Sequence, residues 1–159
     1  MITNIKGNIL DSKANFIAHK VNCFSLDSYL ASQIVDRYSH IEKEYLKYIR
    51  FCNKNKIDIM GAAQYVPIEP WALVMIDTMK NNNIIDYDTN YQYIVNIFCE
   101  SNSDEGNKTN IKAIKKAFED VLENAKRIGG TIAIPDNVGS LVREIIEKYN
   151  VDVEIWRKK

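Results

Sequence analysis

The sequence predicts an α/β fold in which helices cover both faces of a sheet. Short apolar runs of strand length alternate along the chain with longer segments whose apolar residues recur at the helical period. The clearest strand is 91–98, rich in aromatic and β-branched residues, and a strongly amphipathic helix follows it. We expect the 91–98 strand to lie centrally and parallel, beside both 15–21 and 131–134, with the carboxyl ends of all three at one crevice.

The beginning of the chain predicts two strands and a helix. Residues 2–6 alternate weakly between apolar and polar side chains and end at the turn pair Gly7-Asn8. Residues 15–21 form a second, more apolar run. Asp27 and Ser28 offer caps for a helix whose apolar residues follow at a spacing near 3.6.

A second helix and a third strand are predicted next. Ser39-His40-Ile41-Glu42 fits a capping box that opens a helix. Residues 62–66 form a strand that ends at Pro67, because proline cannot donate to a sheet ladder. The stretch 71–90 changes from apolar to very polar and predicts no regular element.

The second half of the chain predicts alternating helices and strands. Thr109 or Asn110 caps the amphipathic helix, and Gly129-Gly130 ends it. The strand at 131–134 is followed by a helix that carries Leu141, Ile145 and Ile146 on one side, and the last strand is 151–156.

Composition and charge limit the classes of protein to consider. The chain has 159 residues, 46% of them hydrophobic, so we expect one soluble domain over 1–159. Its 21 basic and 21 acidic residues cancel, which argues against a nucleic-acid partner. We expect a cytoplasmic protein with no membrane segment. Three cysteines and two histidines form no zinc pattern, and we expect neither a metal nor a cofactor.

Two asparagines at the ends of predicted strands are candidates for ligand binding. Asn8 follows Gly7 at a strand-to-turn corner, where a simple turn amide is the alternative explanation. Asn22 ends a strand that should be buried, and a buried amide must find hydrogen-bond partners. From the residues alone, a structural and a functional role for Asn22 are equally supported.

A strand-to-helix junction at 135–140 is the candidate phosphate site. The sequence is Pro135-Asp136-Asn137-Val138-Gly139-Ser140, directly after a buried strand. Free backbone N–H groups and the helix dipole hold phosphate in this geometry. A plain strand–helix turn capped by Ser140 fits the spacing equally well. No carboxylate pair or nucleophile–base spacing stands out, so the catalytic residues, if there are any, are unknown.

Several segments together resemble the macro domain family over nearly the whole chain. The likeness is greatest to the branch of the terminal ADP-ribose glycohydrolase and its bacterial and phage relatives. It implies a three-layer α/β/α macro-domain-like fold with a mixed central sheet. The matching segments are Gly7-Asn8-Ile9, Ile17-Ala18-His19 leading to Asn22-Cys23, Tyr93-Ile94-Val95-Asn96-Ile97-Phe98, and Ile132-Ala133-Ile134-Pro135.

Two departures from that family's pattern concern its phosphate loops. The Asn-Cys position is usually followed by a glycine-rich segment, but residues 24–30 here contain no glycine. About a dozen family residues are missing after Gly139, including the branch's loop aspartate. Cys99-Glu100 stands where that branch has its catalytic lysine. The resemblance therefore carries over a binding pocket and not the known catalytic groups.

The resemblance implies binding of ADP-ribose or a related adenine nucleotide metabolite, with ADP-ribosylated protein as a further partner. Asn8 and Ile9 would meet the adenine edge, Asn22 the distal ribose, and the Val138–Gly139–Ser140 backbone a phosphate. Trp156 would offer an adenine contact, although a core tryptophan is equally consistent. One alternative is an enzyme with a rearranged site, an ADP-ribosyl glycohydrolase or an ADP-ribose phosphate phosphatase. Another is a degenerate macro fold that serves as a protein-interaction module, through the 71–90 stretch.

Overall fold

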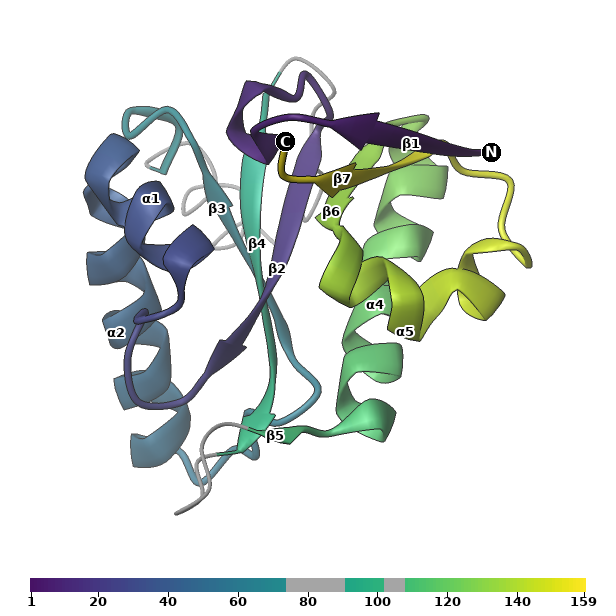
Figure 1. Cartoon of the computed structure of the whole chain (residues 1–159). Coiled ribbons are helices and arrows are strands. Elements are labelled where there is room, and N and C mark those ends of the chain that lie inside the picture. Colours follow the sequence, from purple (N-terminus) through teal and green to yellow (C-terminus); the bar gives the residue numbers. More distant parts are fainter. Residues whose placement is uncertain (74–90, 102–107) are drawn as a thin grey trace.

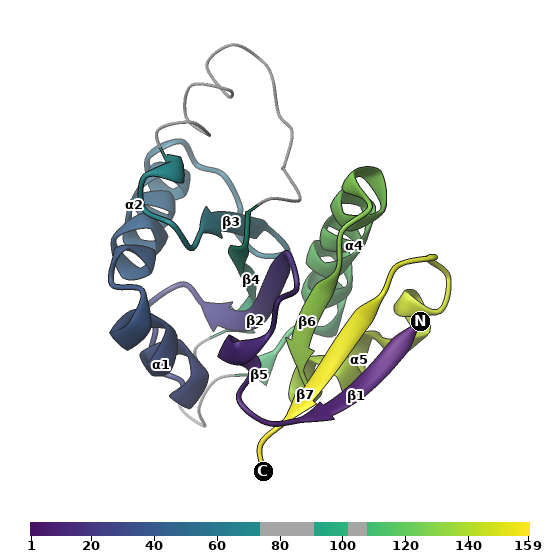
Figure 2. The same ribbon diagram turned by 90° about the horizontal axis from the view of Figure 1, so that it is seen from above.

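The computed structural model describes residues 1–73, 91–101 and 108–159 and arranges them in three layers (Figure 1). Helices α1 and α2 cover one face of a mixed sheet, and α4 and α5 cover the other (Figure 2). The predicted α/β/α fold class is confirmed. The strands are β1 (Ile2–Lys6), β2 (Phe16–Asn22), β3 (Ala63–Pro67), β4 (Tyr93–Ser101), β5 (Lys108–Thr109), β6 (Ile132–Pro135) and β7 (Val153–Arg157). The helices are the 3-10 helix η1 (Ile9–Asp11) and the α-helices α1 (Tyr29–Arg37), α2 (His40–Lys54), α4 (Ile111–Ile128) and α5 (Asp136–Ile146).

The strands of the sheet run in the order β1-β7-β6-β2-β4-β3, and β5 pairs with β4. All neighbouring pairs from β1 to β4 are parallel, while β3 and β5 run antiparallel to β4. The expectation that β4 lies beside β2 is confirmed, but the expectation that it also lies beside β6 is wrong. The helical connection through α4 skips one strand, and β2 occupies the place between β4 and β6.

Several helix ends follow the sequence signals, and two do not. The side chains of Ser28 and Asn110 cap α1 and α4, and Gly129 ends α4 in the left-handed conformation. Ser39 makes no capping bond and has a helical backbone, so the predicted capping box is wrong. The alternative of a turn capped by Ser140 is wrong as well, because α5 begins at Asp136, directly after the strand.

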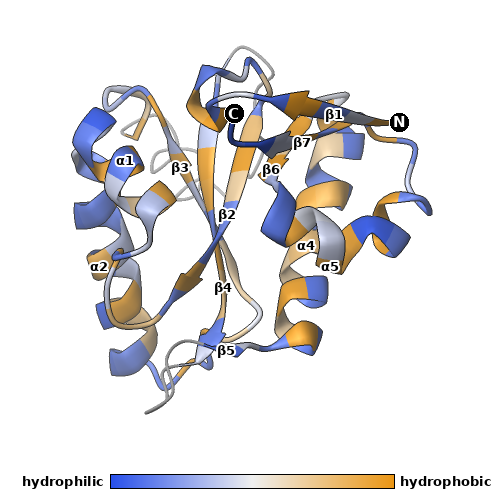
Figure 3. Cartoon of the chain, viewed as in Figure 1, coloured by the Kyte–Doolittle hydropathy of each residue, from blue (hydrophilic) through white to orange (hydrophobic). Residues whose placement is uncertain are grey.

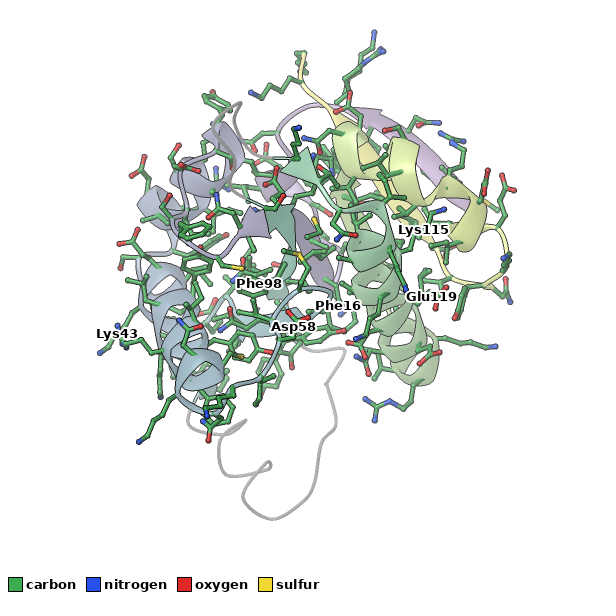
Figure 4. All side chains as sticks on the ribbon, turned by 90° about the horizontal axis from the view of Figure 1, so that it is seen from below. Phe16, Lys43, Asp58, Phe98, Lys115 and Glu119 are labelled. Carbon is green, nitrogen blue, oxygen red and sulfur yellow. The ribbon has the colours of Figure 1, made fainter. Side chains whose placement is uncertain are left out.

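The core lies on both faces of the two central strands. Seven consecutive residues of β4, from Tyr93 to Cys99, are buried, as expected for a strand covered on both sides. Phe16 of β2 packs toward α4, whereas Phe98 of β4 stacks on Tyr45 of α2 with the ring centroids 5.7 Å apart. Figure 4 shows both phenylalanines inside the molecule and Lys43 projecting outward from α2. Hydrophobic residues of the helices face the sheet and polar ones face outward (Figure 3).

In the described part of the chain, no helix is both long enough and apolar enough to cross a membrane.

We predict that the close packing of α5 on β7 requires glycine at position 139. A Cβ atom at Gly139 would lie 2.9 Å from Cγ2 and 3.0 Å from Cδ1 of Ile155. Alanine normally stabilises a helix interior by about 1 kcal/mol over glycine, but overpacking costs about 1–3 kcal/mol. We expect Gly139→Ala to lower the free energy of unfolding by about 1 kcal/mol, measured by urea denaturation. The loss should shrink in an Ile155→Ala background.

The matched control is Ser140→Ala, one residue further along α5 at an exposed position. If Gly139→Ala stabilises the protein as much as this control does, α5 is not packed against Ile155 as described.

Candidate functional site

A cavity of about 1080 Å³ opens at the carboxyl ends of β1, β6 and β7 and beside β2. Its wall includes residues from the turn after β1, from the starts of α1 and α5, and from the end of the chain. This is the edge of a parallel sheet at which ligands bind in α/β proteins. The volume is at the upper end of the range for small-molecule sites.

The opening arises where β2 and β6 separate. Their ladder has only two residue pairs, Phe16 with Ile132 and Ile17 with Ala133, while β2 pairs with β4 to its end. From β6 the chain continues through α5 to β7, and from β2 it continues through α1 on the opposite face. The strand order therefore reverses between these two strands, and a crevice forms at such a point.

The turn after β1 forms one wall of the cavity together with the indole of Trp156. Gly7 has φ +154°, and a Cβ atom there would lie 3.3 Å from the indole. The side-chain oxygen of Asn8 accepts a hydrogen bond from the N–H of Leu10 at 3.0 Å, which caps η1. Asn8 and Ile9 both line the cavity. The indole ring therefore lies directly against the turn that follows β1.

A carboxylate on β7 fixes the orientation of that indole. Nε1–H of Trp156 donates to Oε1 of Glu154 at 3.0 Å. The same oxygen accepts from the hydroxyl of Ser12 at 2.6 Å, and the Ser12 oxygen in turn accepts from the N–H of Ala14 at 3.0 Å. Because Glu154 is itself held by a second donor, the indole plane is set before any ligand arrives.

The first turn of α5 presents free backbone N–H groups to the cavity. The N-cap is Pro135, which has no N–H and makes no side-chain cap. In an α-helix the N–H groups of the first turn have no partner within the helix. The parallel pairing of Pro135 with Trp156 uses the N–H of Asp136, which leaves those of Asn137 and Val138. Pro135, Asp136 and Asn137 line the cavity. An anion at this point would accept hydrogen bonds from these groups and meet the positive end of the helix dipole.

The charged side chains of the wall are mostly cationic. Lys20 of β2 reaches across to β5, where its Nζ donates to the hydroxyl of Thr109 at 3.1 Å. Lys158 lies over the ring of Tyr29, 3.3 Å from the centroid, and so ties the end of the chain to the start of α1. The five cationic wall residues are Lys6, Lys20, Arg157, Lys158 and Lys159, and the three acidic ones are Asp11, Glu100 and Asp136.

His19 of β2 is a buried polar residue in the same wall. It is only 2% exposed, and its Nε2 is 2.7 Å from Oδ1 of Asn96. Burial lowers the pKa of His19 to about 4, against a smaller opposing effect of the Asn96 hydrogen bond. The imidazole is therefore neutral at pH 7.

Three of the seven residues proposed from the sequence line the cavity: Asn8, Ile9 and Trp156. Asn22 does not; its side-chain oxygen accepts from the N–H groups of Phe24 and Ser25 at 2.8 and 2.9 Å. This local turn is the structural role left open for it above. The assignment of these residues to parts of a ligand stays a prediction.

The other three proposed residues lie further along α5. Val138 is fully buried in the core, although its N–H belongs to the open first turn. Gly139 and Ser140 line a neighbouring hollow of about 620 Å³ on the α5 face. Their N–H groups fall in the second turn, where the helix itself supplies acceptors. The helix starts four residues before Ser140, so its free donors lie at Asn137 and Val138.

The sequence did not single out His19, Lys20 or the lysines at the end of the chain. The available signal for His19 was its position within an apolar run. A polar residue in a buried strand needs a hydrogen-bond partner, and a ligand can be that partner. Nothing in the linear sequence indicated that Lys158 reaches Tyr29 of α1.

Several macrodomains of known structure match this chain over nearly its whole length. A macrodomain protein from Streptomyces coelicolor superposes with a TM-score of 0.73 at 17% identity, over 99% of both chains. The macrodomain of Thermus aquaticus DarG gives 0.66 at 15% identity, over 99% of this chain and 98% of that one. Thermosipho africanus DarTG in complex with ADP-ribose gives 0.64 at 16% identity, over 99% of this chain and 41% of that one.

No protein-family model and no curated protein matches the sequence. The chain has the fold of macrodomains, and the resemblance described above is confirmed at the level of the fold. Its closer likeness to the glycohydrolase branch stays a prediction.

Burial of His19 is predicted to make the stability depend on pH below neutrality. An unfolded chain binds a proton at His19 below its ordinary pKa of 6.5, while the folded protein does so only near 4. The unfolded state therefore binds more protons between these values, and stability falls as the pH falls. We expect a loss of about 2 kcal/mol from His19 between pH 7 and pH 5, measured as the urea-unfolding free energy.

The variant His19→Gln separates this effect from other titrations, because it removes the buried imidazole and keeps a polar side chain. It should have a shallower pH slope than the wild type. Identical slopes in the two proteins would contradict the burial of a neutral His19.

Proposed function

We propose that this chain binds ADP-ribose or a related adenine nucleotide metabolite in the cavity at the carboxyl ends of the strands. The observation that carries the proposal is the uncapped first turn of α5 in the wall of a cavity large enough for a nucleotide. The macrodomain fold and the cationic wall support it. Among the matching folds, Thermosipho africanus DarTG was solved with ADP-ribose.

The adenine is assigned to the wall formed by the β1 turn and Trp156. The indole ring is oriented by Glu154 and can pack against a purine. Asn8 already accepts one hydrogen bond at Oδ1, and the second lone pair of that oxygen can accept from the adenine amino group. Ile9 gives an apolar contact beside it.

The diphosphate is assigned to the first turn of α5, at the N–H groups of Asn137 and Val138. Lys20 and Arg157 add positive charge to the same cavity. The distal ribose was assigned to Asn22, whose oxygen already accepts two hydrogen bonds in the turn that follows β2. In that geometry Asn22 would act mainly by holding this turn in place. We also propose that an ADP-ribosylated protein is a binding partner and that the chain acts in the cytoplasm.

The predicted affinity for ADP-ribose is modest. Residues 24–30 have no glycine, so the chain cannot approach a diphosphate as closely there. Losing about two hydrogen bonds to a charged group, at about 1.5–3 kcal/mol each, weakens binding by two orders of magnitude or more against a glycine-complete relative. Isothermal titration calorimetry should therefore give a dissociation constant in the micromolar range or weaker.

One charge change tests where the diphosphate lies. Asp136 is an exposed carboxylate in the first turn of α5 and would repel the diphosphate assigned to that turn. We expect Asp136→Asn to tighten ADP-ribose binding about two- to fivefold at low salt. Glu144→Gln removes the same charge from an exposed position further along α5 and should leave the affinity unchanged. A submicromolar dissociation constant for ADP-ribose that is the same in the wild type and in Asp136→Asn would argue against this placement of the diphosphate.

The second candidate function is hydrolysis of ADP-ribose linkages by a rearranged site. Glu100 favours it, because this carboxylate lines the cavity and could act as a base. The neighbouring thiol of Cys99 does not favour it. Burial, and to a smaller extent the charge of Glu100, raises the pKa of Cys99 to about 12. Cys99 is therefore protonated at neutral pH and a poor nucleophile. The alternative of an interaction module through 71–90 falls mostly outside the described residues.

We expect no release of ADP-ribose from a glutamate-modified protein substrate above the uncatalysed rate, because the described residues of the cavity wall include no activated nucleophile. The assay compares the wild type with Glu100→Gln, and with Glu119→Gln as a surface control on α4 (Figure 4). Turnover that is abolished by Glu100→Gln and kept by Glu119→Gln would establish the enzyme and overturn the binding-only function.

A further inference from the structure

Three polar side chains form a row across three neighbouring strands and end at the cavity. His19 of β2 is paired in register with Asn96 of β4, and Asn96 is paired with Gln64 of β3. Their side chains are joined by hydrogen bonds of 2.7 and 3.0 Å. The outer end of the row bonds to the main-chain carbonyl of Glu44 in α2 at 2.9 Å.

The carbonyl at the outer end fixes the direction of every bond in the row. A carbonyl only accepts, so Gln64 faces it with the amide nitrogen Nε2 and turns Oε1 toward Asn96. Nδ2 of Asn96 therefore donates to Gln64, and Oδ1 of Asn96 faces His19. That oxygen can be satisfied only by a donor, so Nε2 of His19 carries the proton.

This assignment leaves Nδ1 of His19 as an acceptor without a donor. The ring is neutral, so a ring nitrogen that lacks the proton offers a lone pair. Among the buried side-chain nitrogen and oxygen atoms of the described residues, Nδ1 of His19 is the one without a hydrogen-bond partner. Buried acceptors in folded proteins are normally paired, and His19 lies in the cavity wall, where a bound molecule can supply the missing partner.

The position of His19 along β2 indicates which part of a ligand it meets. Ile17 and Ala133 are the last paired residues of β2 and β6. His19 and Pro135 each lie two residues further along their own strands, and Pro135 directly precedes the first turn of α5. A lone pair repels phosphate oxygens and attracts a donor. The groups on either side of a diphosphate in ADP-ribose are riboses, and their hydroxyl groups are donors.

We propose that Nδ1 of His19 accepts a hydrogen bond from a ribose hydroxyl group of the ligand, and that this contact makes the cavity select ribose over deoxyribose. The inference rests on the proposed function, since it takes the diphosphate to lie at α5. It assigns His19 a role in specificity, with Asn96 and Gln64 as positioning residues that hold the ring in the accepting form.

The test measures the affinity for ADP-ribose and for four analogues, each lacking one of the 2′ or 3′ hydroxyl groups of the two riboses. We expect one analogue to bind about five- to tenfold more weakly than ADP-ribose, the usual effect of one neutral hydrogen bond. In His19→Phe this difference should disappear, and ADP-ribose itself should weaken by a similar factor. His40→Phe is the matched control and should keep the discrimination.

A second readout does not depend on the fold of a variant. The ¹⁵N resonance of Nδ1 of His19 in the wild-type protein should move upfield when ADP-ribose binds, because the lone pair becomes a hydrogen-bond acceptor. Equal affinities across the panel together with an unmoved resonance would overturn this inference and leave ADP-ribose binding intact. Failure of every panel member to bind would overturn the proposed function, and this inference with it.

Discussion

The early end of the ladder between β2 and β6 is the constraint on which the candidate site depends. The ladder stops at Ile17 and Ala133, and two residues later β6 ends at Pro135. Proline has no N–H to continue the sheet, but its fixed φ suits the position before a helix. The chain therefore turns into α5 at a point where β2 still has several residues to run. A gap beside β2 and a free helix terminus arise together from this one junction.

The rest of the fold holds the two sides of that gap in place. On one side, Gly139 lets α5 lie close against Ile155 of β7. On the other side, β2 and β4 are paired along their length and buried on both faces. The row of Gln64, Asn96 and His19 adds a polar link from the cavity to α2 through the middle of this core. A polar atom that stays unpaired in a buried row of this kind costs free energy, which makes the unpaired Nδ1 of His19 informative.

The sequence predicted the elements well because their signals are local. Ser28 and Asn110 cap the helices as expected, and the apolar runs at 91–98 and 131–134 are strands. The sheet order was predicted less well, since a connection through a helix does not specify how many strands it skips. Ser39 failed as a cap because its backbone is itself helical, and backbone angles are not read from residue types.

The site was predicted where it follows the ends of strands and missed where it depends on side-chain direction. Asn8, Ile9 and Trp156 lie in the cavity because β1 and β7 are paired neighbours whose ends meet there. Asn22 was a reasonable candidate by type and position, but its oxygen serves the turn after β2. His19 could be recognised as a site residue only once Asn96 and Gln64 were known to lie beside it. The three residues come from three strands in separate parts of the chain.

The most direct test of the account is a crystal structure of the chain with ADP-ribose. We expect the diphosphate within hydrogen-bond distance of the N–H groups of Asn137 and Val138, with the adenine against Trp156. A diphosphate bound away from the first turn of α5, or a nucleotide outside the cavity between β2 and β6, would contradict it.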